Sequence, residues 1–297
     1  MDCAGKLSGR TRFTAIFGDP VEHSLSPAMH NAAYAALGLD RAYVAFHVAP
    51  AHLRVAIHGV AALGLLGVNL TVPHKERALR MMAHLSDEAR TLGAINCVVN
   101  RDGVLYGDNT DARGLESDLR DRGLQLEGRH AVIVGAGGAA AAAVLAAIRL
   151  GAGRITICNR TVARANRLAR RFATYVTSRA GGRPHELIEG RGLETLSHSG
   201  TLSDAALFAN ATPVGLQSGL MLPIDYAATP SHCLFYDLVY SRELTSFLKP
   251  AADLGRRVMD GAGMLAGQGA LAFELFNQIA PPPGLMRATL MTALGRA

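Results

Sequence analysis

The stretch that decides the fold covers residues 132–140 and reads Val-Ile-Val-Gly-Ala-Gly-Gly-Ala-Ala. The three β-branched residues predict a buried strand, and the small residues after them predict a tight turn that opens a helix. In such a unit Gly135 permits the turn, Gly137 lets the backbone approach a pyrophosphate, and Ala140 leaves room for the helix to pack on the strand. The N–H groups at the helix start would hold the phosphates. The stretch therefore predicts a dinucleotide site.

The next strand, residues 155–158, indicates which dinucleotide is bound. It is followed by Asn159-Arg160-Thr161, with Arg164 one helical turn further on. An NAD-binding domain usually ends this strand in an acid that binds the ribose hydroxyls, and no acid is present here. An added 2′-phosphate favours guanidinium and hydroxyl donors. We therefore expect NADPH rather than NADH, the alternative being an ordinary helix cap at Thr161 with solvated arginines.

Apolar strand-like runs alternate with helix-like runs along the chain, which favours mainly parallel sheets. The pattern predicts strands at residues 14–17, 42–46, 67–70, 94–99, 104–106, 130–134, 155–158, 205–209, 234–238 and 257–259. It predicts helices at 26–38, 50–64, from 75 onward, 111–122, 138–150 and 265–278. We expect two α/β units, the second of Rossmann type, with the boundary inside the helix at 111–122. The stretch 179–200, rich in Gly, His and Ser, is interpreted as a surface connection.

Composition excludes several classes of protein. With 49% hydrophobic and 18% charged residues among 297, the chain can form a packed core, which excludes wholesale disorder. The net charge of +6 is spread along the chain, its densest run being Arg164–Arg171, and aromatic residues make up only 5%. A nucleic-acid binder would more often interleave a basic stripe with aromatics. The charge suits anionic small molecules, with a merely solvated surface as an equal alternative.

The cysteines and the apolar runs bear on location. Cys3, Cys97, Cys158 and Cys233 form no CxxC pair, which is typical of thiols in a reducing cytosol. The amino terminus lacks the apolar core of a signal peptide. The uncharged run 131–148 approaches the length of a membrane span, but its glycines and alanines favour the strand, turn and helix described above. We therefore expect a cytoplasmic protein that binds no membrane and no nucleic acid.

The first half of the chain carries a second set of polar residues. Ser24 and Ser26 stand one residue apart before Pro27, where Ser26 could cap a helix with Pro27 as its first residue. In extended backbone the two hydroxyls would point the same way and could hold a carboxylate. The alternative is that Ser26 is only a cap.

Lys75 and Asp111 are the strongest candidates for chemistry. Each follows an apolar run in a segment with further polar residues, where an open α/β sheet binds its ligands. A Lys and an Asp in one cleft can share the proton that interconversion of a carbonyl and an alcohol requires. The alternative is a surface salt bridge.

Eight ordered motifs between Thr14 and Phe276 make the sequence resemble the shikimate dehydrogenase family. They are His-Ser-Leu-Ser-Pro at 23–27, Asn-Leu-Thr-Val-Pro-His-Lys at 69–75, Gly-Ala-Ile-Asn at 93–96, Asn-Thr-Asp at 109–111, Gly-Ala-Gly-Gly-Ala at 135–139, Asn-Arg-Thr at 159–161, Asn-Ala-Thr-Pro-Val-Gly at 210–215 and Gly-Met-Leu-Ala-Gly-Gln at 263–268. The resemblance implies NADPH-dependent reduction of 3-dehydroshikimate to shikimate on the route to aromatic amino acids. It also implies that Lys75 donates the proton while Asp111 orients it, the two titrating as a coupled pair.

The resemblance further implies a set of binding residues. Substrate contacts would come from Ser24, Ser26, Thr71, Asn96, Thr110, Asp111, Tyr240 and Gln268. Cofactor contacts would come from Gly135, Ala136, Gly137, Gly138, Ala139, Asn159, Arg160, Thr161 and Arg164, and on the nicotinamide side from Thr212, Leu238, Gly261 and Met264. No metal is expected. Because Gln268 stands on the last predicted helix, we expect a substrate-binding domain of residues 1–113 plus 265–297 with an NADP-binding domain of residues 114–264 inserted.

Two departures from the family pattern stand out. Arg242 occupies a position where the family often has proline, and His74 stands beside the lysine where many members carry Phe.

Three alternative functions stay open: a quinate/shikimate dehydrogenase, an enzyme acting on an amino-substituted shikimate, or a non-catalytic NADPH-binding regulator. The absence of an acid after residues 155–158 disfavours an NAD-dependent quinate enzyme, and a regulator need not keep Lys75 with Asp111. Oligomeric state does not follow from the sequence, and a homodimer is the assembly considered.

Overall fold

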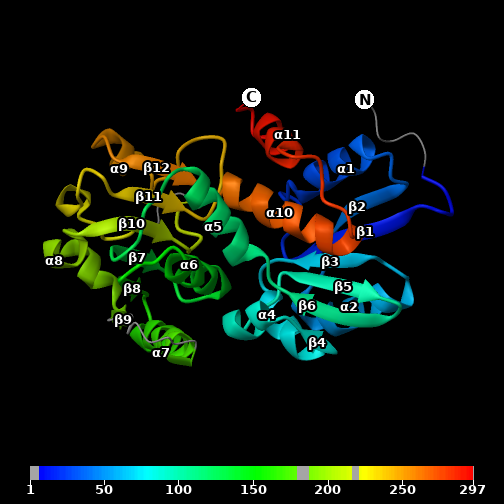
Figure 1. Ribbon diagram of the computed structural model, residues 1–297, viewed down its shortest axis with the longest axis horizontal. Helices are drawn as coiled ribbons and strands as arrows, with labels where there is room; N and C mark the ends of the chain where they lie inside the picture. Colours follow the sequence, from blue (N-terminus) through cyan, green and yellow to red (C-terminus); the bar gives the residue numbers. More distant parts are fainter. Residues whose placement is uncertain (1–6, 179–186, 216–220, 297) are drawn as a thin grey trace. The chain divides into compact units, whose positions relative to one another are not determined.

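The computed structural model describes residues 7–178, 187–215 and 221–296 (Figure 1). The chain divides into two compact units. The first consists of Met1–Gly114 with Leu265–Ala297, and the second of Leu115–Met264. Both are α/β, as the alternation of apolar strands and helices predicts.

The first unit contains a six-stranded sheet with the order β2-β1-β3-β5-β6-β4. Its strands are β1 Arg12–Gly18, β2 Arg41–His47, β3 Gly67–Leu70, β4 His84–Leu85, β5 Cys97–Arg101 and β6 Val104–Asp108. β1 pairs in parallel with β2 and β3, whereas β5 runs antiparallel to both of its neighbours. A turn at Asp102 and Gly103 joins β5 to β6, and this hairpin makes the sheet mixed rather than parallel throughout.

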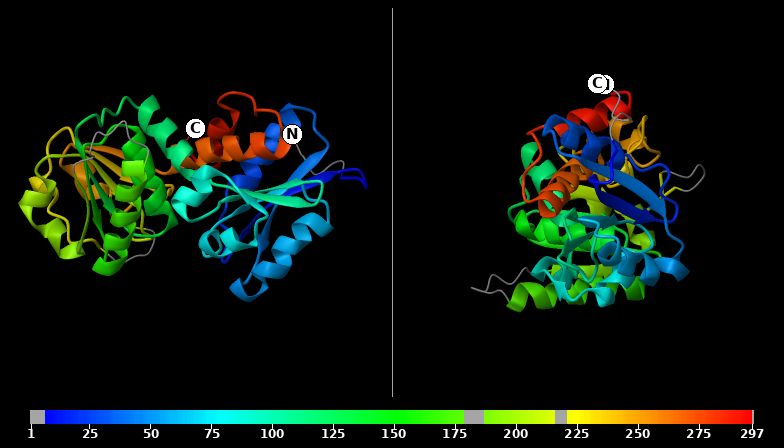
Figure 2. Two further views of the ribbon diagram at one scale, coloured as in Figure 1. Left: turned by 60° about the horizontal axis from the view of Figure 1, so that its bottom comes forward. Right: turned by 90° about the vertical axis from the view of Figure 1, so that its right-hand side faces the viewer.

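Helices cover both faces of this sheet (Figures 1 and 2). They are α1 Ser26–Ala36, α2 Leu53–Ala62, α3 Lys75–Ala78, α4 Asp87–Leu92, α11 Leu285–Ala293 and the end of α10 Ala262–Asn277, with 3-10 turns at Pro50–His52 and Leu79–Met81. The division between the units falls inside α10 and inside α5 Asp111–Asp121. Leu53, Ile57 and Val60 of α2 pack with the β1 and β3 side chains of one face. On the other face, Tyr34 of α1 bonds to Thr14 of β1, and Phe276 of α10 lies against Gly67 of β3. The end of α10 thus belongs to the core of the first unit.

The second unit contains a six-stranded, fully parallel sheet with the order β12-β11-β10-β7-β8-β9. Its strands are β7 His130–Val134, β8 Arg154–Cys158, β9 Leu187–Arg191, β10 Ala205–Asn210, β11 Leu234–Asp237 and β12 Arg257–Asp260. Its helices are α6 Gly138–Arg149, α7 Val162–Ser178, α8 Ser199–Leu202 and α9 Lys249–Asp253, with 3-10 turns at Leu193–Ser197 and Tyr226–Ala228. This is the doubly wound order of a Rossmann sheet: successive strands are added outward from β7 to β9 on one side, and then from β10 to β12 on the other. The strand, turn and helix predicted for residues 132–140 are confirmed as the end of β7, a glycine turn and the start of α6.

The run at 131–148 lies in β7, a turn and α6, not in a single helix. All residues from Ala140 to Ala147 are buried, because α6 packs its small side chains against the sheet. Among the described residues, no helix is both long and apolar enough to cross a membrane.

Some sequence predictions need correction. The segment 94–96 is not strand: the Ile95 N–H donates to the Lys75 carbonyl outside the sheet, and β5 begins only at Cys97. Part of the stretch interpreted as a surface connection lies outside the described residues, but Leu187–Arg191 forms β9. β9 is an edge strand of five residues with Glu, Gly and Arg, so it lacks the apolar pattern that would have revealed it. α10 begins at Ala262, three residues before the predicted start.

Candidate active site

Lys75 and Asp111 lie at the first positions of α3 and α5 and form an ion pair. The Lys75 Nζ donates to Asp111 Oδ2 at 2.6 Å. The Asp111 side chain is 5% exposed and that of Lys75 22%, so the carboxylate is enclosed while the ammonium reaches solvent. This is not the exposed pair that the alternative interpretation required, because exposed pairs leave both partners hydrated.

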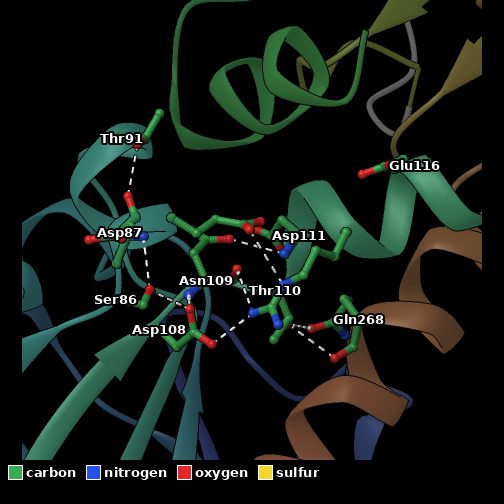
Figure 3. Close-up of polar contacts among 12 residues, drawn as sticks. Ser86, Asp87, Thr91, Asp108, Asn109, Thr110, Asp111, Glu116 and Gln268 are labelled. Carbon is green, nitrogen blue, oxygen red and sulfur yellow. Dashed lines mark hydrogen bonds and ion pairs between the residues drawn. The ribbon is translucent and has the colours of Figure 1, made fainter. Parts of the chain in front are cut away.

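Neutral amides and a hydroxyl surround the pair. Asn96 Nδ2 donates to Asp111 Oδ1 at 2.7 Å and to Thr110 Oγ1 at 2.9 Å, and it lies 3.2 Å from Gln268 Oε1. Thr110 Oγ1 in turn donates to the backbone oxygen of Gln268 at 3.1 Å. The α10 residue Gln268 therefore meets the start of α5, although 158 positions separate it from Thr110 (Figure 3). Five of the residues proposed for catalysis or substrate binding form one hydrogen-bonded cluster.

Asn109 holds the turn that presents Asp111. Its Oδ1 accepts the Asp111 N–H at 3.0 Å, and its Nδ2 donates to the Ala94 carbonyl at 2.9 Å. The side chain is fully buried. Next to it, Asp108 accepts hydrogen bonds from Ser86, from the Asn109 N–H at 2.7 Å and from Arg113 at 2.7 Å (Figure 3). These contacts anchor the first turn of α5, so that Asp111 has little freedom to move.

Ser24 and Ser26 differ from their sequence-based description. Leu25 precedes α1 with φ −92° and ψ 0°, so the backbone is not extended there and strand alternation does not orient the two hydroxyls. Ser26 is the first helical residue and caps nothing, because no side-chain cap hydrogen bond is formed. Instead the Ser26 N–H donates to Ser24 Oγ at 3.3 Å. The interpretation of Ser26 as only a cap is therefore wrong.

Tyr43 links Ser26 to the hydrogen-bonded cluster around Asp111. Burial raises the pKa of Tyr43 well above its usual range, and a hydrogen bond from the Ser26 side chain opposes that shift. Tyr43 donates to Asn69 Oδ1 at 2.8 Å, and Asn69 Nδ2 donates to the Asn96 carbonyl at 3.0 Å. A continuous polar chain thus runs from Ser26 to Asn96.

Thr71 follows β3 directly and is half-buried. Its N–H donates to the Phe17 carbonyl at 3.0 Å, and its methyl group lies over Gly18, where a Cβ would come within 2.4 Å of it. The close packing over Gly18 places Thr71 at the end of β3, four residues before Lys75.

The glycine turn between β7 and α6 has the geometry expected of a phosphate-binding turn. Gly135 has φ +120°, a conformation that favours glycine, and an added Cβ would approach the Ala211 carbonyl to 2.9 Å. Gly137 precedes α6 without a side-chain cap, and nothing lies within 4 Å of the point where its Cβ would be. Ala140 is fully buried. Open space above Gly137 and uncapped N–H groups fit a pyrophosphate.

The residues expected at the adenosine end follow β8. Asn159 is half-buried, and its Nδ2 donates to the Thr161 carbonyl at 3.0 Å. Arg160, Thr161 and Arg164 are exposed. None of them forms an ion pair among the described residues, so their donors face solvent and suit a phosphate.

The residues expected on the nicotinamide side lie at the ends of three neighbouring strands. Thr212 follows β10, Leu238 follows β11 and Gly261 follows β12. An added Cβ on Gly261 would approach the Leu238 carbonyl to 2.2 Å, so these two backbones touch. Met264 lies in the first turn of α10 and is buried, with 8% exposure. Tyr240 follows Leu238 in the same unit and is half-buried.

Comparison with known proteins identifies the family. Models of the shikimate dehydrogenase substrate binding domain, the shikimate/quinate 5-dehydrogenase and the shikimate 5′-dehydrogenase C-terminal domain match residues 16–98, 118–180 and 261–291. A shikimate dehydrogenase (NADP⁺) of Geobacter sp. strain M21 is 40% identical over 97% of both chains. The chain belongs to the shikimate dehydrogenase family.

The fold is also similar to solved structures of this family. The Thermus thermophilus shikimate 5-dehydrogenase in complex with NADP(H) and shikimate has a TM-score of 0.82 and 36% identity, covering 95% of this chain and all of the other. The Corynebacterium glutamicum quinate dehydrogenase in complex with NAD has a TM-score of 0.84 but only 27% identity, over 95% and 99% of the two chains. The fold is therefore common to both activities and does not by itself distinguish them.

The two departures from the family pattern have different surroundings. His74 is fully buried, and its Nε2 lies 2.7 Å from the Val48 carbonyl, so it ties the segment before Lys75 to the end of β2. Burial lowers the pKa of His74 while this backbone contact opposes the shift. Arg242 is exposed and lies in the segment after Tyr240, so it takes no place in the core.

Three residues of the first unit were not assigned by sequence reasoning. Asn109 belongs to the Asn-Thr-Asp motif and Asn69 is the first residue of another motif, so the sequence could have indicated a role for both. Tyr43 carried none beyond its place in an apolar strand, because its contacts join segments far apart in the chain.

Proposed function

We propose that this protein catalyses the reversible, NADPH-dependent reduction of 3-dehydroshikimate to shikimate, as an oxidoreductase of aromatic amino acid biosynthesis. The observation that carries the proposal is the enclosed Lys75–Asp111 pair within a cluster of neutral hydrogen-bonding groups. Such a cluster suits a ring that bears hydroxyls and one carbonyl, because neutral donors and acceptors recognise hydroxyls without repelling one another.

Bound NADPH supplies a hydride to the carbonyl carbon. Lys75 supplies the proton: its Nζ–H bond breaks as an O–H bond forms on the carbonyl oxygen, which leaves a neutral amine. Asp111 holds Nζ from one side and directs the remaining donors toward the substrate. Because Lys75 is partly exposed, solvent restores its proton, and the reverse reaction uses the neutral amine as base.

Substrate orientation is assigned to two groups of side chains. Asn96, Thr110 and Gln268 lie around Asp111 and would contact the ring hydroxyls, as would Thr71. Ser24 and Ser26 would hold the carboxylate, which is supported by the absence of a capping role for Ser26. Tyr240, which belongs to the second unit, is assigned to the substrate on the resemblance alone.

The second unit is assigned the cofactor. The backbone at residues 135–139 would bind the pyrophosphate, and Asn159, Arg160, Thr161 and Arg164 would bind the adenosine 2′-phosphate. Thr212, Leu238, Gly261 and Met264 would line the nicotinamide. We accordingly propose residues 1–113 plus 265–297 as the substrate-binding domain and residues 114–264 as the NADP-binding domain.

Steady-state oxidation of shikimate and of quinate, each with NADP⁺ and with NAD⁺, tests this function. We expect shikimate with NADP⁺ to have the highest kcat/KM of the four combinations. A higher value for quinate or for NAD⁺ would favour the quinate/shikimate alternative. If all four activities were absent while NADP⁺ still bound, the protein would be either a regulator or an enzyme for an amino-substituted shikimate. Assays with the amino-substituted compound would distinguish these two.

For location and assembly we propose a cytoplasmic homodimer. Cys97, Cys158 and Cys233 are unpaired and buried, as befits a reducing compartment. β2 lies at the edge of its sheet and exposes Phe46, which offers a strand edge to a second copy. The molar mass in solution, measured by light scattering, would contradict the dimer if it equalled that of one chain.

A further inference from the structure

Asp237, the last residue of β11, is a fully buried carboxylate held only by neutral donors. Its Oδ1 accepts from Asn210 Nδ2 at 3.0 Å and from the Val239 N–H at 3.3 Å, and its Oδ2 accepts from Thr245 Oγ1 at 2.6 Å. Within the described ranges, no Lys or Arg pairs with it. Burying a carboxylate without a cationic partner costs free energy, which its hydrogen bonds only partly offset, so we looked for what these contacts position.

Asn210 connects this carboxylate to the loop after β10. Its Nδ2 also donates to the Val214 carbonyl at 2.8 Å, while its Oδ1 accepts from the Thr212 N–H at 3.1 Å and from Thr212 Oγ1 at 2.7 Å. These four contacts settle which end of the amide faces Asp237, because only the NH₂ end can donate. The position of Thr212 therefore depends on the amide that Asp237 orients.

The backbone passes directly over the carboxylate at Gly215. Its φ is +113°, and an added Cβ would lie 3.3 Å from Asp237 Oδ2 and 3.3 Å from the Thr245 Cβ. On the other side, Leu238 follows Asp237 at once, and its N–H donates to the Asn210 carbonyl at 2.9 Å. Asp237 thus lies beneath two loops that follow neighbouring strands.

We propose that Asp237, held by Thr245, is a positioning residue for cofactor binding, which fixes Thr212 and Leu238 through Asn210 so that both contact the nicotinamide. The proposal rests on the function proposed above, since it takes the nicotinamide to lie against these two residues. Its ionised form is the working form, because every partner donates to it. A protonated carboxyl donates either toward an N–H group, which loses its hydrogen bond, or to the Thr245 oxygen, which must then turn its own hydroxyl away.

The surroundings make this state sensitive to pH. Burial raises the pKa of Asp237 to about 7, against the hydrogen bonds from Thr245, Val239 and Asn210, and the nearby charge of Asp260 on β12 raises it further. The charge of Asp237 also acts on Tyr226, where it adds to the burial that raises the pKa of the phenol. Cofactor affinity is therefore expected to weaken as the pH falls from 8 to 6.

Thr245 offers a matched test, because its hydroxyl is the shortest contact to Asp237. Thr245→Val removes that donor at nearly constant volume, whereas Thr245→Ser keeps it. We expect Thr245→Val to weaken NADP⁺ binding to the isolated enzyme by about ten-fold, with the affinity for shikimate alone within two-fold of wild type. Thr245→Ser should restore NADP⁺ affinity. Equal NADP⁺ affinity in Thr245→Val and wild type would overturn the proposal.

Asp237→Asn removes the negative charge and the titration of this side chain, so it tests the pH dependence directly. We expect NADP⁺ affinity to fall by ten- to a hundred-fold and to lose its dependence on pH between 6 and 8. Asp253→Asn, an exposed acid on α9, should leave both unchanged. If Asp237→Asn fails to fold, the proposal is decided by comparing Thr245→Val with Thr245→Ser and by the pH dependence of NADP⁺ affinity in the wild type. NADP⁺ binding is measured without turnover. The role of Asp237 can therefore be tested even if the dehydrogenase assay shows no activity.

Discussion

Lys75 is the residue on which the proposed chemistry depends most. Lys75→Ala removes the proton donor and leaves Asp111 buried beside Asn96. We expect kcat for shikimate oxidation to fall by about 10²- to 10⁴-fold, with the affinity for NADP⁺ unchanged. Lys249→Ala, which removes an exposed lysine of α9, should keep wild-type activity. Activity that survives Lys75→Ala largely intact would refute the catalytic role.

For single residues, the contacts that a side chain makes in the folded protein decide its role more than its local sequence does. Ser26 has the sequence of a helix cap, yet its hydroxyl is paired with Tyr43 instead. Asn109 looks like an ordinary polar turn residue, yet it holds both Ala94 and Asp111. These pairings are made across strands, so local propensity does not reveal them.

Between elements, the contact of β3 with α10 shows how the last helix belongs to the first sheet. Gly67 of β3 leaves the space that the Phe276 ring fills, and an added Cβ would come within 2.4 Å of that ring and 2.6 Å of the Val98 carbonyl. We expect Gly67→Ala to reduce the free energy of unfolding by about 1–3 kcal/mol, because the ring and the β5 backbone must both shift. Urea unfolding followed by circular dichroism measures this change.

Gly59 provides the control for that substitution. It lies inside α2, and its Cβ would meet only the Leu63 side chain at 3.9 Å. Gly59→Ala should therefore stabilise the protein by about 0.5–1 kcal/mol, since alanine loses less entropy in a helix. Equal effects at the two glycines would show that α10 does not pack on β3 as described.

At the scale of the whole molecule, His30 makes stability depend on pH. The residue is fully buried, it stacks on Tyr43 with ring centroids 4.1 Å apart, and burial lowers its pKa from 6.5 to about 3. As the pH falls below 6.5, the unfolded chain binds a proton that the folded chain refuses. The stability is therefore complete above pH 6.5 and is lost progressively between pH 6.5 and about 3.

This loss amounts to about 2 kcal/mol between pH 7.5 and pH 5. We expect His30→Phe, which keeps the stacking on Tyr43, to remove that part of the decline in unfolding free energy. His58→Phe changes an exposed histidine of α2 and should leave the decline as in wild type. The comparison is made by urea unfolding at several pH values. An equally steep decline in His30→Phe would exclude His30 as its source.

The sequence by itself determined the class of fold and the order of most elements. Strands and helices with strong periodicity, such as β7 with α6, were predicted nearly to the residue because local pattern and burial agree there. Short elements were missed, among them β4, β9 and α11, because a few residues carry too little pattern. Most candidate site residues were likewise found through motifs that are continuous in the chain, Arg164, Leu238, Tyr240 and Gly261 being the exceptions.

Only the tertiary structure decided which of these residues meet. It joined Gln268 of α10 to Thr110 and Asn96, showed that Ser26 does not cap its helix, and placed Asp237 beneath the loops that carry Thr212 and Leu238. The physical reason is that periodicity is a property of one segment, whereas a hydrogen bond between distant segments depends on the register and packing of the whole sheet. The residues that bear the chemistry can be read along the chain, but the residues that hold them in position appear only when the strands are side by side.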